Sequence, residues 1–374
     1  MGQWHDPLGW WTCMERPFRC LSRPLGWAAL AMIALAMAWS AVHFLPGEGG
    51  WPQAAAGTVE LAEDEGDIAL YDRILDRVEA GENYYAAALS EQRAGNYPTR
   101  PFVTVRLPTL AMLHRWIGRD GVGLLLGGLL ILTALCSYLA VAKQAAMGER
   151  LGIVVATIFG GAAVAIPQAP LIHELLAGLL LSLALVTYRR ERWWPALLLA
   201  AAALVVRELA AAFVLLWLAF AAIERRWGEV GALALLLALF ALGMGAHYAG
   251  VEVYQLPDDA ASQGWDAMAG LGLPILALSK LTALLLLPTW LAAALALLPL
   301  VGWLALGGRL GLFATFWFAG FSAAIALFAR PENFYWAQMM LPAYCAGYAF
   351  VPRAIADCLA SARGTVRPPT SKQS

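Results

Sequence analysis

The sequence consists mainly of long apolar runs that are separated by short polar segments. The runs are continuous rather than alternating, so they predict helices and not the strands of a barrel. About 20 apolar residues are enough to cross the roughly 30 Å hydrocarbon layer of a bilayer. The runs cover residues 25–45, 121–142, 151–166, 171–188, 195–206, 209–223, 229–248, 281–306, 310–328 and 335–352. The pattern therefore predicts an all-α membrane bundle of about ten spans.

The distribution of basic residues predicts how this bundle is oriented. Alternating the runs across the membrane places nearly every basic cluster on the side of the N-terminal arginines, which is the cytoplasmic side by the positive-inside rule. These clusters are Arg16/Arg19/Arg23, Lys143/Arg150, Arg189/Arg190/Arg192, Arg225/Arg226, Arg309 and Arg353/Arg363/Arg367/Lys372. We expect a cytoplasmic N-terminal tail (1–24), a bundle (25–352) and a cytoplasmic C-terminal tail (353–374). The first run is followed by His43–Phe44–Leu45–Pro46 rather than a small-residue cleavage site, so it predicts an uncleaved helix.

Residues 195–223 can be interpreted as one helix or as two. A single helix of this length would span about 43 Å and would put Arg190 and Arg226 on opposite sides of the membrane. Two short helices that meet at Arg207–Glu208 keep both arginines on the cytoplasmic side. The charge pattern favours the two short helices, with their tip below the outer membrane surface.

The long polar segment at 46–120 lies between the first two spans and is predicted to be an outer loop. It carries twelve acidic and seven basic side chains. Tyr71, Ile74, Leu75 and Val78 follow the spacing of an amphipathic helix, and Gly81 is expected to end it. A turn-rich stretch that includes Tyr84–Tyr85 follows, and then a second amphipathic helix over about 104–118. We expect both helices to lie flat on the outer membrane face.

Composition supports a membrane protein and excludes one class of partner. The chain of 374 residues is 61% hydrophobic and 14% charged, far from the composition of a soluble domain. Its net charge of −1 gives nucleic acid no basic surface to bind. Only three of its 25 Lys and Arg residues are Lys, which is typical of a GC-rich bacterial genome. The expected location is therefore a bacterial cytoplasmic (inner) membrane.

Charged and polar residues in the predicted outer loops are the candidates for a functional site. Ionisable groups at membrane depth are costly unless they are paired or wet, so they indicate function or structural pairing. The candidates are His173, Glu174, Arg207, Glu208, Lys280, Arg330, Glu332, Asn333 and Tyr335, together with Arg100 and an acidic cluster at Glu63–Asp67. Asp67 also follows Gly66 at the start of a predicted helix, where it would serve as an N-cap.

These residue types suit transfer of a group from a lipid-linked phosphate. Arginine matches the geometry of phosphate oxygens, and a carboxylate can orient or deprotonate a hydroxyl nucleophile. His43, His173 and His247 lie near the predicted outer ends of helices and could, with the carboxylates, bind a divalent metal. Their spacing carries no metal-site signature, so no metal ligands are assigned.

The order of elements resembles the GT-C superfamily of integral membrane glycosyltransferases. Asp67-x-x-x-Tyr71 with Gly81 is similar to the first outer loop of its aminoarabinose- and mannosyl-transferase branch, as is the segment Tyr97–Arg100–Pro101. The acidic residue that acts as base in that branch would fall on Asp67, but the Glu of its Asp–Glu pair would fall on Ile68. Asp64–Glu65 is an intact pair with a different spacing to Tyr71, so both assignments stay open. The resemblance does not extend to the soluble C-terminal domain of some relatives.

The resemblance implies transfer of a hexosyl or pentosyl group from a polyprenyl-phosphate sugar to an envelope glycan, lipid or protein on the non-cytoplasmic face. Asp67 would activate the acceptor hydroxyl, and Arg207, Arg330 or Lys280 would hold the phosphate. The alternatives are a transporter or flippase of a lipid-linked or anionic solute, a polymerase or ligase of lipid-linked glycans, and a non-catalytic scaffold.

Overall fold

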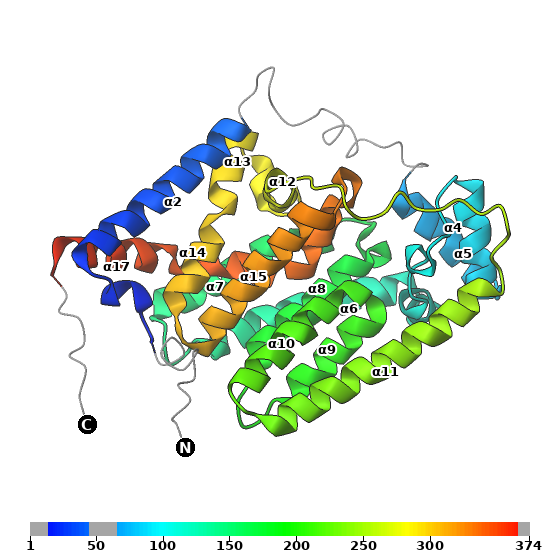
Figure 1. The fold of residues 1–374 in the computed structure, drawn as a ribbon, viewed down its shortest axis with the longest axis horizontal. Coiled ribbons are helices and arrows are strands. Elements are labelled where there is room, and N and C mark those ends of the chain that lie inside the picture. The colour runs from blue at the N-terminus through cyan, green and yellow to red at the C-terminus, as the bar shows by residue number, and fades with distance from the viewer. Residues whose placement is uncertain (1–13, 45–65, 366–374) are drawn as a thin grey trace.

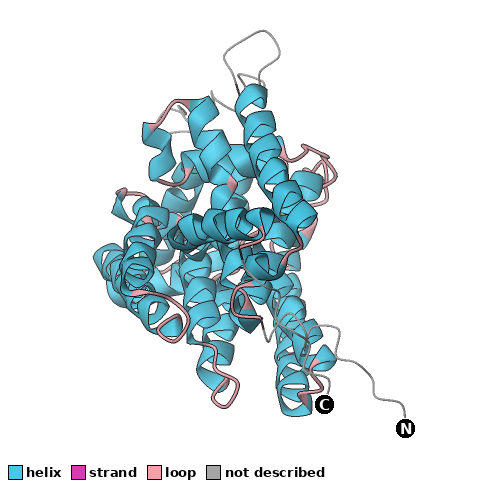
Figure 2. Ribbon diagram, turned by 90° about the vertical axis from the view of Figure 1, so that its left-hand side faces the viewer, coloured by secondary structure: helices cyan, strands magenta, loops and turns pink. Residues whose placement is uncertain are grey.

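The computed structural model describes residues 14–44 and 66–365, and within these ranges the chain folds into helices and loops without a strand (Figure 1). The only β-type contact there is an isolated bridge between Arg100 and Ala261. Viewed from the side, helices fill the molecule and loops lie mostly at their ends (Figure 2). The all-α fold predicted from the sequence is confirmed.

Five helical segments among the described residues are long and apolar enough to cross a bilayer. They correspond to α2 (Arg23–His43), α6 (Thr109–Ala140), α11 (Trp227–Glu252), the consecutive helices α13 (Thr289–Ala296) and α14 (Leu298–Leu306), and α15 (Gly308–Phe328). A helical membrane protein is the fold class that these segments support. The count of about ten spans stays a prediction.

Shorter apolar helices fill the middle of the bundle. They are α7 (Met147–Gly160), α8 (His173–Thr187), α9 (Trp194–Val206) and α10 (Ala211–Ile223). The break between α9 and α10 falls at Arg207, whose backbone is extended, and a 3₁₀ turn at Glu208–Ala210 follows it. Two short helices meeting at Arg207–Glu208 are therefore confirmed. Nearly all of α8 is buried, so it is the central helix of the bundle.

The last apolar run, 335–352, was predicted as one helical span, and this prediction is wrong. The structure has a 3₁₀ segment η7 (Pro331–Met340), a short helix α16 (Ala343–Ala346) and another 3₁₀ turn η8 (Gly347–Phe350). This backbone packs directly on its neighbours: a Cβ on Gly178 of α8 would lie 2.0 Å from the Gln338 carbonyl oxygen, and one on Gly302 of α14 would lie 1.8 Å from that of Gly347. Apolarity alone does not reveal such backbone contacts.

The α-helix predicted for residues 281–306 begins later than predicted, at Thr289. The helix α12 (Gly272–Lys280) ends where the run starts, and the 3₁₀ turn η6 (Ala283–Leu286) lies between α12 and α13. The Thr282 side chain caps this turn by accepting a hydrogen bond from the Leu284 N–H. The cap and Pro288 separate α12 from the long segment Thr289–Leu306.

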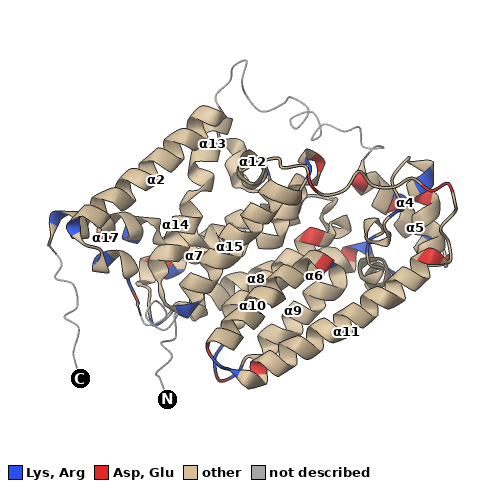
Figure 3. Ribbon diagram, viewed as in Figure 1, with Lys and Arg blue, Asp and Glu red and all other residues tan. Residues whose placement is uncertain are grey.

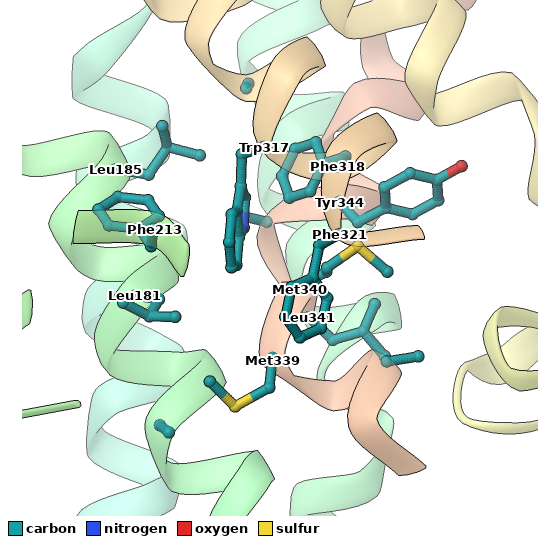
Figure 4. Packing of buried hydrophobic residues seen from close by; sticks show 14 of the residues in the cluster. Leu181, Leu185, Phe213, Trp317, Phe318, Phe321, Met339, Met340, Leu341 and Tyr344 are labelled. Carbon is teal, nitrogen blue, oxygen red and sulfur yellow. The ribbon is translucent and has the colours of Figure 1, made fainter. Parts of the chain in front are cut away.

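The core is built from large apolar side chains of helices that are distant in sequence. Leu185 of α8 and Phe213 of α10 face Trp317 of α15, and Met339 and Leu341 of the η7 region lie beside them (Figure 4). Phe213 and Trp317 meet edge to face with ring centroids 5.2 Å apart. Because lipid is as apolar as these side chains, such close packing rather than hydrophobicity holds membrane helices together.

The outer loop forms a small helical layer. Its helix α4 (Asp67–Glu79) ends before Gly81, as predicted, and Leu70, Ile74 and Val78 bury its apolar face. The stretch at 84–94, predicted to be turn-rich, is instead helix α5 (Tyr84–Ala94). Asn83 nucleates it by accepting hydrogen bonds from the N–H groups of Tyr85 and Ala86, and tyrosine pairs are no barrier to a helix.

The predicted second amphipathic helix of the outer loop also forms, with shifted bounds. A 3₁₀ turn η2 covers Phe102–Thr104, and α6 begins at Thr109. The backbone of Gly118 has φ 74°, which leaves the helical region and separates an amphipathic start from the membrane segment of α6. α4 is fastened to this point by Arg119, whose guanidinium lies 2.6 Å from the Asp76 carboxylate.

The charged residues divide the molecule into two ends. Asp and Glu are prominent around α4, α5 and the segment 253–271, whereas Lys and Arg predominate at the opposite end (Figure 3). At that basic end α17 (Val351–Arg363) packs on α2, α14 and the 3₁₀ turn η1 (Pro17–Cys20). Arg16 donates to the Asp357 carboxylate at 2.9 Å, so the first and last described segments meet at one end.

Candidate functional site

Several of the residues singled out from the sequence gather where α4, α6, α8, α9 and η7 converge. We call this group the outer polar cluster. Its members are Asp67, Tyr71, Arg106, His173, Glu174, Arg207, Glu208, Asn333 and Tyr335. They come from five segments that are far apart in sequence, so the tertiary fold alone brings them together.

Asp67 is the first residue of α4 but does not cap it. The N-cap position is Gly66, with φ 103°, and no side chain accepts a hydrogen bond from the helix start. The Asp67 carboxylate instead accepts a hydrogen bond from the hydroxyl of Tyr335 at 2.7 Å. The N-cap interpretation is therefore wrong, and the carboxylate, half-buried, is directed toward the cluster.

Tyr335 connects the carboxylate to the cations. Its hydroxyl oxygen accepts from Arg106 Nη2 at 3.0 Å and from Asn333 Nδ2 at 3.3 Å, while its proton goes to Asp67. A phenol hydroxyl can donate one hydrogen bond and accept two, so every hydrogen-bonding position of the Tyr335 hydroxyl is occupied. Asp67 is thus held through Tyr335 at a fixed position relative to Arg106.

Arg106 is a central member of the cluster that was not predicted. Its Nε donates to the Tyr71 hydroxyl at 2.9 Å, and its Nη2 lies 3.7 Å from a Glu174 oxygen. The signal in the sequence was a single charge inside the otherwise uncharged and mostly apolar stretch Phe102–Pro108. An ionisable side chain at membrane depth is costly unless it is paired or hydrated. The same argument singled out the other candidates from the sequence.

Glu174 and Arg207 form the buried base of the cluster, with the partly exposed Glu208 beside them. Arg207 Nε donates to Glu174 at 2.6 Å, and both side chains are almost fully buried, at 1% and 2% exposure. Arg207 also forms an ion pair with Glu208. With two carboxylates on one guanidinium and no solvent exposure, Arg207 acts as a buried counter-charge rather than as a free phosphate ligand.

Tyr71 and His173 form the aromatic wall of the cluster. Their rings meet edge to face at 5.2 Å, and burial raises the pKa of Tyr71 above its ordinary range, so the phenol keeps its proton. Nδ1 of His173 and Oδ1 of Asn333 are buried and have no hydrogen-bond partner among the described residues. Buried polar atoms are rarely left unpaired, so these two atoms are positions where a bound molecule can make hydrogen bonds.

The remaining candidates lie elsewhere. Arg100 donates to the Leu256 carbonyl at 2.8 Å, and Arg330 Nη2 contacts the Ser262 hydroxyl at 3.2 Å. Both arginines therefore hold the extended segment 253–271, which we call the strap. Lys280, at the end of α12, and Glu332 are exposed, and no described contact joins either to the cluster. Asp64 and Glu65 lie outside the described residues.

The three histidines considered for a metal site, His43, His173 and His247, lie apart from one another in the described part of the chain. His247 contacts the Tyr85 hydroxyl at 3.2 Å and the Val105 carbonyl at 3.0 Å, whereas His43 stacks on Trp39. His247 and His43 therefore have contacts of their own, and no described contact joins either of them to His173. In the ranges 14–44 and 66–365, no group of three or more His, Cys, Asp and Glu side chains is arranged to hold a metal ion.

Comparison of the chain with models of known protein families, with curated proteins and with solved structures found no match. Function is therefore argued from the cluster itself.

Proposed function

We propose that this protein is a membrane glycosyltransferase that moves a sugar from a polyprenyl-phosphate donor to an acceptor on the non-cytoplasmic side. The observation that carries the proposal is the half-buried Asp67 carboxylate, held by Tyr335 within a network that also contains Arg106. A carboxylate fixed beside a cation at one end of a membrane bundle suits activation of a hydroxyl group near a lipid phosphate.

In the proposed reaction Asp67 accepts the proton of the acceptor hydroxyl. The acceptor oxygen forms a bond to the anomeric carbon, and the bond from that carbon to the donor phosphate breaks, with its electron pair leaving on phosphate. Arg106 is the cation of the cluster nearest to Asp67 through Tyr335, and its side chain is 12% exposed. Charge that develops on the leaving phosphate would be stabilised by such a cation.

Other features of the cluster support a bound polar substrate. His173 Nδ1 and Asn333 Oδ1 lack partners, and sugars supply hydroxyl groups that donate and accept hydrogen bonds. Arg207 pairs with Glu174 and Glu208 beneath them, and Glu174 lies 3.7 Å from Arg106, so these three residues are assigned the role of positioning Arg106. The acceptor and the sugar are left open by this proposal.

The proposal is tested by replacing Asp67→Asn and measuring transfer from a radiolabelled polyprenyl-phosphate sugar with purified protein. Loss of a general base typically lowers the rate by about 10²–10⁴-fold, and we expect a loss in that range. Asp72→Asn is the matched control, because Asp72 lies on the same helix and pairs with Arg119 away from the cluster. We expect Asp72→Asn to retain nearly full activity.

Two results would contradict the proposal. Equal transfer by the wild-type protein and Asp67→Asn would exclude Asp67 as the base. No turnover with any polyprenyl-phosphate sugar, combined with movement of a lipid-linked solute across vesicles, would identify a transporter instead.

A further inference from the structure

A cavity of about 520 Å³ lies at the basic end of the bundle, opposite the outer polar cluster. Four helices meet around it: the last residues of α6 and α8, the first residues of α15, and Phe213 and Trp217 of α10. Its volume is within the range of pockets that bind small molecules, about 300–1,000 Å³. None of the residues of the outer polar cluster lines this cavity.

The lining of the cavity is divided into a charged rim and an apolar interior. The rim carries four basic side chains, Lys143, Arg189, Arg190 and Arg309, against the single acidic Glu224. The buried apolar part of the lining consists of Leu185, Phe213, Trp217 and Phe313, whereas Leu139 and Ala140 lie on its more exposed side. Such a surface matches an amphiphile with an anionic head and an apolar tail.

Arg309 supplies a second, independent observation. Its Nε donates to Glu224 at 2.8 Å, and its guanidinium stacks on the ring of Tyr188 at 4.1 Å. Its Nη2 is buried and has no hydrogen-bond partner among the described residues. A buried guanidinium nitrogen without an acceptor is costly, so an acceptor group of a bound molecule that reached Arg309 would be stabilising.

The rim also holds two cationic side chains that have no hydrogen-bond or ion-pair partner among the described residues. The side chains of Lys143 and Arg190 are exposed, and neither has a hydrogen bond or ion pair with a described residue. They come from the loops after α6 and α8 and lie on the same cavity as Arg309. Lys143 and Arg190 are thereby unpaired cationic side chains on the lining that also contains Arg309, which pairs with Glu224.

We infer that this cavity binds an anionic phospholipid from the leaflet at the basic end. Its phosphate would lie among Arg309, Lys143 and Arg190, and an acyl chain would follow Leu185 and Phe313 into the bundle. The positive-inside rule assigns this end to the cytoplasm, where basic pockets between membrane helices bind anionic lipid headgroups. A soluble phosphate would leave the apolar interior uncovered. The inference is independent of the chemistry proposed for Asp67.

The test is a lipid titration of detergent-purified protein, followed by native mass spectrometry. Phosphatidylglycerol, phosphatidylcholine with the same acyl chains, and inorganic phosphate are the three ligands compared. We expect phosphatidylglycerol to bind at least tenfold more tightly than the other two. The double variant Lys143→Gln/Arg190→Gln should weaken that binding by about tenfold or more, given the attraction of each cation for an anionic lipid.

A matched control separates a built site from general attraction to a basic surface. Arg192→Gln/Arg225→Gln removes two exposed cations that are predicted to be on the same side of the membrane but do not line the cavity, and it should leave binding unchanged. Ala140→Phe keeps every charge but places a large side chain in the lining, so it should also weaken phosphatidylglycerol binding.

Three outcomes would overturn the inference. Equal binding of both phospholipids would exclude an anion-selective site. Equal losses in the two double variants would show general surface attraction. Binding of inorganic phosphate as tightly as phosphatidylglycerol would identify an anion site without a role for the lipid tail.

Discussion

At the scale of single residues, the charged side chains of the cluster differ in whether their partners are charged or neutral. Glu174 and Arg207 are buried together, and each has a second partner of opposite charge, Arg106 for Glu174 and Glu208 for Arg207. Asp67 differs because its partner is a neutral phenol. No cation is directly paired with it among the described residues, which is why it is the proposed base.

The strap carries a carboxylate whose protonation state can be tested. Asp259 lies 2.6 Å from Arg93 and accepts a hydrogen bond from the Leu256 N–H. Burial alone would raise its pKa, but these hydrogen bonds outweigh burial and hold the pKa below the ordinary 3.8. A lowered carboxyl pKa means that the stabilisation is present above pH 3.8 and is lost as pH falls through the pKa of the folded protein.

We therefore expect the strap to be protected from hydrogen exchange at pH 7 and to lose protection well below pH 3.8, after correction for intrinsic exchange rates. Asp259→Asn should be unprotected at pH 7 already. The neighbouring Asp258→Asn is the control, since Asp258 is exposed and should not matter. Equal protection in Asp259→Asn and wild type at pH 7 would show that the Arg93 contact does not hold the strap.

At the scale of elements, close backbone contacts decide how the inner helices pack. Gly302 of α14 and Gly347 of η8 face each other, and a Cβ on Gly347 would lie 2.1 Å from the Pro299 carbonyl oxygen. Small residues at such contacts let helices approach closely in lipid, where tight packing is the main source of association. Apolar periodicity cannot distinguish these glycines from others on the lipid-facing surface.

Gly302→Ala should therefore separate α14 from η8 and destabilise the protein by about 1–3 kcal/mol, the usual cost of overpacking. The midpoint of thermal unfolding in detergent is the measurement. Gly243→Ala, on α11, is the matched control because a Cβ there would meet nothing within 4 Å. An unchanged midpoint for Gly302→Ala would contradict the packing described here.

At the scale of the whole molecule, charge is distributed between two ends that hold two different sites. The outer polar cluster and the strap lie at the end of α4 and α5, whereas the cavity lined by Arg309 lies at the other. The first and last described segments join at the basic end through Arg16 and Asp357. The positive-inside rule then predicts a cytoplasmic cavity and a non-cytoplasmic cluster.

This orientation can be measured with single cysteines introduced into a variant whose five native cysteines are replaced by alanine. On intact cells a membrane-impermeant thiol reagent should label Asp258→Cys in the strap. Arg190→Cys, at the cavity rim, should react only after permeabilisation. Labelling of both positions in detergent is the control, and the reverse pattern on cells would invert the proposed orientation.

The sequence by itself determined the fold class, most long helices, the start of α4 and the break at Arg207. All of these features depend on local properties, namely the length of apolar runs, their spacing and the sign of nearby charges. Such properties can be read directly from the amino-acid sequence. The charge rule also singled out most of the cluster, including Glu174, Arg207 and Tyr335. The sequence analysis did not predict α5, although its Ala, Leu, Glu, Gln and Arg residues favour a helix and Asn83 caps its start.

Only the tertiary structure decided which of these groups meet. Asp67 and Tyr335 are 268 positions apart, and nothing in either local sequence indicates that one donates to the other. The structure likewise brought Arg106 into the cluster, placed Arg100 and Arg330 on the strap, and set Arg309 beside Glu224 at the cavity. Side-chain partners follow from the packing of distant helices, whereas the pattern along the chain specifies only which residues each helix carries.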